Sequence, residues 1–96
     1  MNDDFLAPPP FQPDAALQRL HRELRDLGLT QRADAWEWKG RPVLTVVVVD
    51  GVLRASVAKR PARTPDWQVH RLADHARVRW LVEHLRVSMR GWQPDD

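Results

Sequence analysis

The sequence predicts an α+β domain, α-β-β-β-α, in which two helices pack on one face of a three-stranded antiparallel meander. Two β-branched runs flank Asp50-Gly51, the strongest short hairpin signal that a sequence can carry. Leucines recur at helical spacing before this hairpin. A long apolar-patterned segment after it ends at Gly91. With 96 residues, the chain has room for one domain with a single modest core.

We expect this domain to span residues 14–91, between an extended, proline-rich acidic tail (1–13) and a short acidic tail (92–96). The sequence contains no cysteine, which excludes disulfides, thiolate zinc sites and a cysteine nucleophile, and fits the cytoplasm. Its longest apolar run, 43–49, is far shorter than the roughly 20 residues of a membrane span. The first residues lack the basic start of a signal peptide, so we expect neither membrane insertion nor export.

The first helix is expected from about Asp14 to Leu27. Its apolar stripe consists of Leu17, Leu20, Leu24 and Leu27. Gly28 follows where a left-handed residue closes a helix. Leu29 is then placed to fold back on Leu24 in a Schellman motif.

The first strand is expected at 33–39, where Trp36 and Trp38 share one face. Two registers with the next strand are open. A two-residue turn at Gly40-Arg41 would place both indoles on the outer face of the sheet, whereas a three-residue turn that includes Pro42 would place both in the core. We favour the core, because two large exposed rings would be costly.

The other two strands, 43–49 and 52–59, are joined by Asp50-Gly51 in a type I′ turn, which pairs Val49 with Val52. One face of this hairpin is wholly apolar and is expected in the core: Leu44, Val46, Val48, Leu53, Ala55 and Val57. The opposite face mixes apolar and polar residues, and four of its eight residues are valines. It consists of Val43, Thr45, Val47, Val49, Val52, Arg54, Ser56 and Ala58.

The second helix is expected from Thr64-Pro65, a cap followed by a proline at the first helical position, to about Met89 or Arg90. Its apolar residues form two opposite stripes. One stripe holds Val69, Leu72, Ala73, Ala76, Trp80 and Val87, and the other Trp67, Val78, Leu81, Val82, Leu85 and Met89. Either the helix bends near 76–78, or a straight helix is covered on two sides. With the outer valines, this apolar surface predicts a partner chain, so we expect a homodimer, another protein partner, or both.

No pattern in the sequence indicates an enzyme. The serines lie outside nucleophile motifs, the histidines do not converge on a metal site, and the glycines are explained by turns and caps. We therefore expect no catalytic residue, no metal and no cofactor. Residues 54–90 carry nine basic against three acidic side chains, and thirteen of the fifteen basic residues of the chain are arginine.

Two functions follow as hypotheses. The first is a non-enzymatic protein-interaction module, acting as adaptor, inhibitor or accessory subunit. Its expected partner-binding residues are Lys59, Arg60, Arg63, Trp67, Trp36, Trp38 and Val47. We expect the loop from Lys59 to Trp67 to be the functional edge, because two prolines stiffen it beside an arginine pair and an indole. The second is a nucleic-acid-binding protein that contacts phosphates through Arg60, Arg63, Arg71, Arg77 and Arg79.

The element order over roughly residues 14–89 resembles that of double-stranded-RNA-binding domains, which bind RNA by its shape. Two stretches depart from that family's pattern. Lys39-Gly40-Arg41-Pro42 lacks the family's histidine-containing loop, and Thr64-Pro65-Asp66-Trp67 stands where the family has a lysine cluster. The resemblance implies recognition of the shape of the nucleic acid. From the arginines themselves, we expect any binding to nucleic acid to be weak and independent of sequence, because contacts to phosphate do not read the bases and lose affinity with salt.

Overall fold

The structure, a computed structural model, describes residues 10–93. Within this range the chain forms two helices and a five-stranded sheet. The elements follow one another as α1 (Pro13–Asp26), β1 (Thr30–Arg32), β2 (Ala35–Trp38), β3 (Arg41–Val49), β4 (Val52–Ala58), β5 (Trp67–Leu72) and α2 (His75–Gly91).

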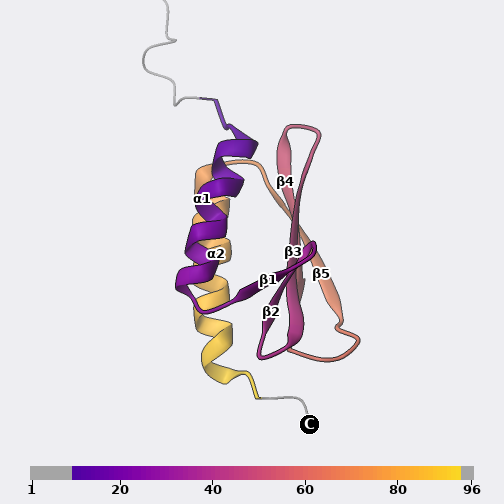
Figure 1. Ribbon diagram of the computed structural model, residues 1–96. Helices are drawn as coiled ribbons and strands as arrows, with labels where there is room; N and C mark the ends of the chain where they lie inside the picture. Colours follow the sequence, from indigo (N-terminus) through magenta and orange to yellow (C-terminus); the bar gives the residue numbers. More distant parts are fainter. Residues whose placement is uncertain (1–9, 94–96) are drawn as a thin grey trace, which may run out of the picture.

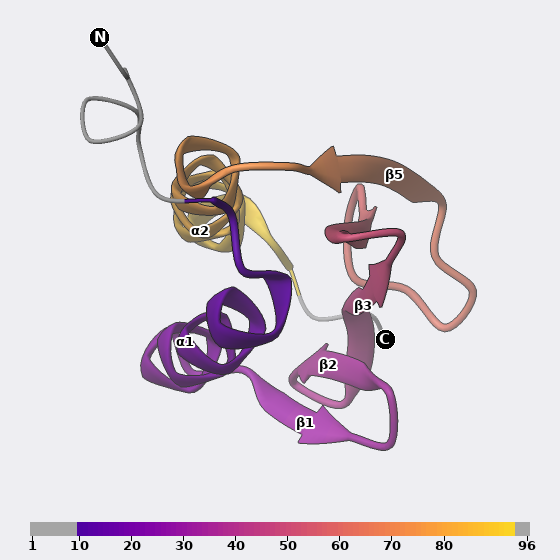
Figure 2. The ribbon, with the colours of Figure 1, turned by 90° about the horizontal axis from the view of Figure 1, so that it is seen from above.

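The five strands pair antiparallel in chain order, so that β1 and β5 form the two edges of the sheet. Both helices lie on the same face of the sheet, and no helix formed by residues 10–93 covers the opposite face (Figures 1 and 2). The predicted α+β class and the placement of the helices are confirmed. The predicted three-stranded meander is wrong, because β1 and β5 extend it on either side.

Helix α1 matches its sequence pattern closely. Pro13 occupies its first turn, and Leu20 and Leu24 are fully buried. At its end Gly28 has a φ of 96° and donates its N–H to the carbonyl of Arg25, while Leu29 donates to that of Leu24. These two bonds make the predicted Schellman motif, which turns the chain from the helix toward the sheet.

The β3–β4 hairpin has the predicted type I′ turn, with φ of 52° at Asp50 and 78° at Gly51, and the predicted pairing of Val49 with Val52. The face predicted for the core is buried except at Val48, which is 38% exposed. Strand β2 pairs with β3 only as far as Thr45, so the end of β3 has a neighbour on one side alone.

Strand β2 meets β3 in neither predicted register. The turn residues are Lys39 and Gly40, both with positive φ, and a register shift follows between Trp36 and Glu37. This shift leaves one extra residue, Val43, in β3, and Val43 is fully buried although it was predicted on the outer face. Trp36 is in the core, as favoured, but it lies opposite Leu44.

Strand β1 was not predicted. Its three residues, Thr30, Gln31 and Arg32, are all exposed and polar, so no apolar alternation marks them as a strand. They form a hairpin with β2 through the turn at Ala33 and Asp34.

The largest correction concerns residues 67–72, which form β5 and not the first turns of a helix. All six pair with β4 without a register shift. Helix α2 begins only at His75, where the side chain of Asp74 accepts the backbone N–H of Arg77 at 2.8 Å. This boundary removes the puzzle of two opposite stripes, because the early members of both stripes lie on a strand. One stripe of α2 itself is buried: Val78, Leu81, Val82 and Leu85.

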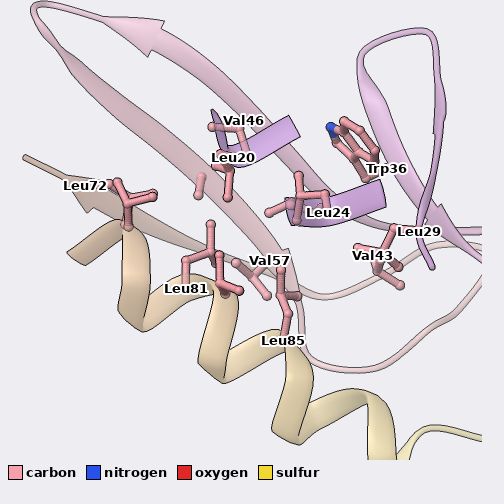
Figure 3. Close-up of a cluster of buried hydrophobic side chains, with 14 of the residues drawn as sticks. Leu20, Leu24, Leu29, Trp36, Val43, Val46, Val57, Leu72, Leu81 and Leu85 are labelled. Carbon is pink, nitrogen blue, oxygen red and sulfur yellow. The ribbon is translucent and has the colours of Figure 1, made fainter. Parts of the chain in front are cut away.

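The core lies between the two helices and the inner face of the sheet (Figure 3). Leu20 and Leu24 reach it from α1, Leu81 and Leu85 from α2, and Trp36 from β2. Beyond α2, Trp92 packs edge-to-face on Trp38, with ring centroids 5.6 Å apart. Trp92 was assigned to the C-terminal tail but is buried.

Candidate functional site

The outer face of the sheet carries the clearest candidate site. Its exposed apolar side chains include Val69, Val47 and Trp67, which are 62%, 41% and 39% exposed. Val49 and Val52 lie beside them at the hairpin end and are half-buried. We call these five side chains, with Arg54 and Arg71, the outer-face patch. Single scattered apolar residues are ordinary on a protein surface, whereas several gathered on one sheet face that no helix covers are typical of a binding site.

Strand register brings the patch together from three strands. Val47, Arg54 and Arg71 form one row across β3, β4 and β5. Val49 and Val52 are paired at the end of the hairpin. Val69 lies two residues before Arg71 in β5 and therefore on the same face. Part of this surface is hollowed into a groove of about 450 Å³. The groove is lined by Val49, Asp50, Val52, Arg54, Val69 and Arg71.

Arg54 and Arg71 are directly opposite each other on neighbouring strands, and both are exposed. Neither forms an ion pair with any residue between 10 and 93. Like charges in directly opposed positions destabilise a sheet, typically by some tenths of a kcal/mol. A carboxylate between the two guanidinium groups would remove this repulsion and accept strong, charge-assisted hydrogen bonds.

The segment from Lys59 to Trp67, which was expected to be the functional edge, is anchored to the domain. The backbone N–H of Lys59 donates to the carbonyl of Asp66 at 3.1 Å, and Pro61 is buried. Arg60 and Arg63 are exposed and form no ion pair with a described residue. At the end of the loop, Trp67 joins the outer face of the sheet.

The two other tryptophans of the predicted partner site belong to the inner face. Trp36 is 1% exposed and packs beneath α1, with His21 5.3 Å from its ring and the guanidinium of Arg25 5.9 Å away. Trp38 is half-buried between Trp92 and the ammonium of Lys39, which lies 4.8 Å from its ring. Trp36 offers no surface to a partner. Of the predicted partner site, the structure therefore brings Trp67 and Val47 to the outer face and keeps Lys59, Arg60 and Arg63 in the adjoining loop.

The five arginines predicted to bind nucleic acid lie on different parts of the molecule. Arg60 and Arg63 are in the β4–β5 loop, and Arg71 is on the outer face of β5. Arg77 and Arg79 are on α2, the first with its guanidinium 4.6 Å from the Trp80 ring and the second in a groove between the two helices. The set does not form one basic face.

A cluster of rings at the β5 edge was missed by the sequence analysis. His70 on β5 makes an edge-to-face contact with Trp80 at 4.9 Å, and His84 stacks on the same indole at 5.0 Å. Burial, reinforced by the nearby His84 and Arg77, lowers the pKa of His70 below its ordinary value. Its Nε2 is buried and has no hydrogen-bond partner among the described residues. The misassigned helix hid this contact, because it placed His70 and Trp80 on one helix.

Within residues 10–93, no group of three histidine or acidic side chains could hold a metal ion. Neither helix in this range is both long and apolar enough to cross a membrane. Comparison of the chain with protein-family models, with curated proteins and with solved structures finds no match. Function must therefore be argued from the surface of the molecule itself.

Proposed function

We propose that this protein is a non-enzymatic protein-interaction module that binds a partner through the outer-face patch. The observation that carries the proposal is a sheet face without a helix over it, on which two groups of exposed apolar side chains flank two opposed, unpaired arginines, Arg54 and Arg71. Desolvating this surface would be favourable for the valines and for Trp67. Arginine and tryptophan are also the residues most often found at binding hot spots.

The chemistry of the patch indicates the character of the partner. An apolar surface on the partner would cover Val47, Val49, Val52 and Val69. An aspartate or glutamate on the same surface would lie between Arg54 and Arg71 and relieve their repulsion. We therefore infer an acidic, amphipathic protein surface as the ligand, which fits an adaptor, inhibitor or accessory subunit.

The composition of the face favours protein over nucleic acid. Sheet surfaces that bind single strands rely on several aromatic rings, on which successive bases stack. The described part of this face offers one indole, Trp67, among valines that give bases no stacking surface. The remaining arginines of the nucleic-acid hypothesis lie off this face, which weakens that alternative.

Site-specific photocrosslinking in cells tests the proposal. A benzoylphenylalanine placed at Val47 should capture a discrete partner, because Val47 lies in the row of Arg54 and Arg71. The matched control is the same probe at Arg22, an exposed position of α1 on the other layer of the molecule. We expect the adduct at position 47 to be absent at position 22 and to disappear when Arg71→Glu is added. An adduct at position 22 alone, or one that is indifferent to Arg71→Glu, would place the site elsewhere.

A further inference from the structure

The two edges of the sheet differ sharply. Strand β1 is a short edge of three exposed polar residues, one of the ways in which proteins prevent edge-to-edge pairing. Strand β5 is longer, pairs with β4 along all six residues without a bulge, and contains neither proline nor lysine. It also carries Val69, the most exposed of the large apolar side chains described. In Figure 2 no other helix or strand of the described part of the chain lies beyond β5.

Hydrogen bonding at the base of β5 shows which of its backbone groups face outward. Lys59 donates its N–H to the carbonyl of Asp66, so these opposed residues are a hydrogen-bonded pair. Such pairs alternate along an antiparallel ladder. The register that places Ala58 opposite Trp67 then directs the backbone of Gln68, His70 and Leu72 toward β4. The N–H and C=O groups that point away from the sheet belong to Trp67, Val69 and Arg71.

We propose that β5 pairs antiparallel with β5 of a second copy of this chain, about a twofold axis at Val69. Val69 then lies opposite Val69 of the second copy, and Trp67 lies opposite Arg71 of the second copy. Each of these residues turns its free N–H and C=O toward the other chain, so both hydrogen bonds of each pair can form. The result is a continuous ten-stranded sheet made from two copies of the five-stranded one.

Side chains favour this register. The two Val69 side chains cover each other, and each Arg71 guanidinium faces an indole, a cation–π arrangement. The two Arg71 positions are separated by four residues along the ladder, which is about 13 Å and exceeds the Debye length of roughly 8 Å at physiological ionic strength. Arginine therefore gains an aromatic partner in the dimer without facing another arginine across the twofold axis.

A register shifted by one residue is worse both for the contact between the valines and for the separation of the two Arg71 side chains. Centred on His70, it would place Val69 opposite Arg71 and move the two Arg71 positions to within about 7 Å of each other. It would also leave the outward groups of Trp67 opposite Ala73, which lies beyond the end of β5. Of these two registers, the one centred on Val69 makes the strand complementary to itself, which is the reason for assigning a second copy as its occupant.

This inference concerns the edge of the sheet and does not rest on the partner proposed for the face, although Trp67, Val69 and Arg71 contribute to both. Pairing through β5 leaves Val47 and Arg54 uncovered, and it joins the outer faces of two copies into one surface. A dimer without a face partner, or a face partner without a dimer, would therefore show separately.

The test uses the absence of cysteine from the sequence. The substitution Val69→Cys introduces one thiol, which in the proposed dimer lies opposite its own copy at about 5.5 Å between Cα atoms, within disulfide range. The matched control is Val47→Cys, which is exposed on the same face but lies on β3. After mild oxidation, Val69→Cys should form a disulfide-linked dimer at least tenfold faster than Val47→Cys. Equal rates, or faster oxidation of the control, would overturn the edge pairing.

A second variant, Val69→Pro, tests the dimer through its mass in solution and needs no thiol. Light scattering on a size-exclusion column should give about twice the 11.2 kDa of the chain. Val69→Pro should give the monomer mass while keeping the fold, because the lost N–H points away from β4 and proline is tolerated on a free edge. Circular dichroism and thermal melting check the fold. A monomeric wild-type protein, or a folded Val69→Pro variant that stays dimeric, would contradict the proposal, and should Val69→Pro fail to fold, the oxidation rates decide.

Discussion

Two adjacent residues in β3, Val43 and Leu44, show where the burial of a side chain cannot be predicted from the sequence pattern. Leu44 follows the inward–outward alternation of its strand. Val43 is also buried, although the alternation would turn it outward, because the register shift opposite Trp36 inserts an extra residue into β3. Pro42, which comes just before Val43 in β3, is compatible with a bulge but does not by itself locate one. The hairpin at Asp50-Gly51 was predictable from the pair Val49–Val52 as far as Leu44–Val57, because its turn chemistry fixes the register locally. The register of β2 was not, because it depends on how Trp36 fits beneath α1.

His70 carries a prediction about pH. Burial lowers its pKa in the folded state below the unfolded value, so between the two values the unfolded chain binds more protons. The contribution of neutral His70 to the unfolding free energy is therefore fully present above about pH 6.5. It is lost as the pH falls from there through the folded-state pKa. His70→Phe keeps an aromatic ring against Trp80 but cannot titrate. Chemical denaturation from about pH 7.5 to 5.5 should show a shallower loss of unfolding free energy in the variant, by a fraction of the ~1.4 kcal/mol per pH unit of one full proton. Parallel profiles for both proteins would mean that His70 is not responsible.

Among the elements, α1 and the β3–β4 hairpin were predictable because local signals define both their period and their ends. Residues 67–72 were not. Their apolar positions, Trp67, Val69 and Leu72, fit a helix that continues into α2 as well as they fit a strand, and Thr64-Pro65 imitates a helix start. What decides is β4, whose outer edge would be unpaired without β5. That is tertiary information, and with it the second apolar stripe of the predicted helix disappears.

The true start of α2 can be tested at its cap. Asp74 accepts the backbone N–H of Arg77, so Asp74→Ala should lower the unfolding free energy by about 0.5–2 kcal/mol. Asp66→Ala is the matched control, because Asp66 is exposed and contributes its backbone carbonyl, which the substitution keeps, to the contact with Lys59. Urea denaturation of the two variants measures the difference. If Asp66→Ala cost more than Asp74→Ala, the helix would begin nearer the position that the sequence first indicated.

At the scale of the whole molecule, the described residues form a two-layer domain in which the helices cover only one face of the sheet. Its inner face is covered by both helices, while its outer face keeps apolar side chains and two opposed arginines in the open. Sequence patterning revealed the excess of valines on that face, but not that β5 would complete it by adding Arg71 and Val69. The basic segment from Lys59 to Trp67, which its composition predicted to be the functional edge, adjoins this surface. Only Trp67 belongs to both.

Charge reversal distinguishes the outer face of the sheet from the β4–β5 loop as the surface that binds the partner. One variant carries Arg54→Glu and Arg71→Glu on the sheet, and the other Arg60→Glu and Arg63→Glu in the loop, so both change the net charge equally. The yield of the photocrosslinked partner from position 47 should fall at least tenfold in the sheet variant and change less than twofold in the loop variant, a ratio that corresponds to about 1 kcal/mol or more. Both variants should keep their melting temperatures within a few degrees, because all four side chains are exposed. Loss of the partner in the loop variant, with the sheet variant unaffected, would contradict the account.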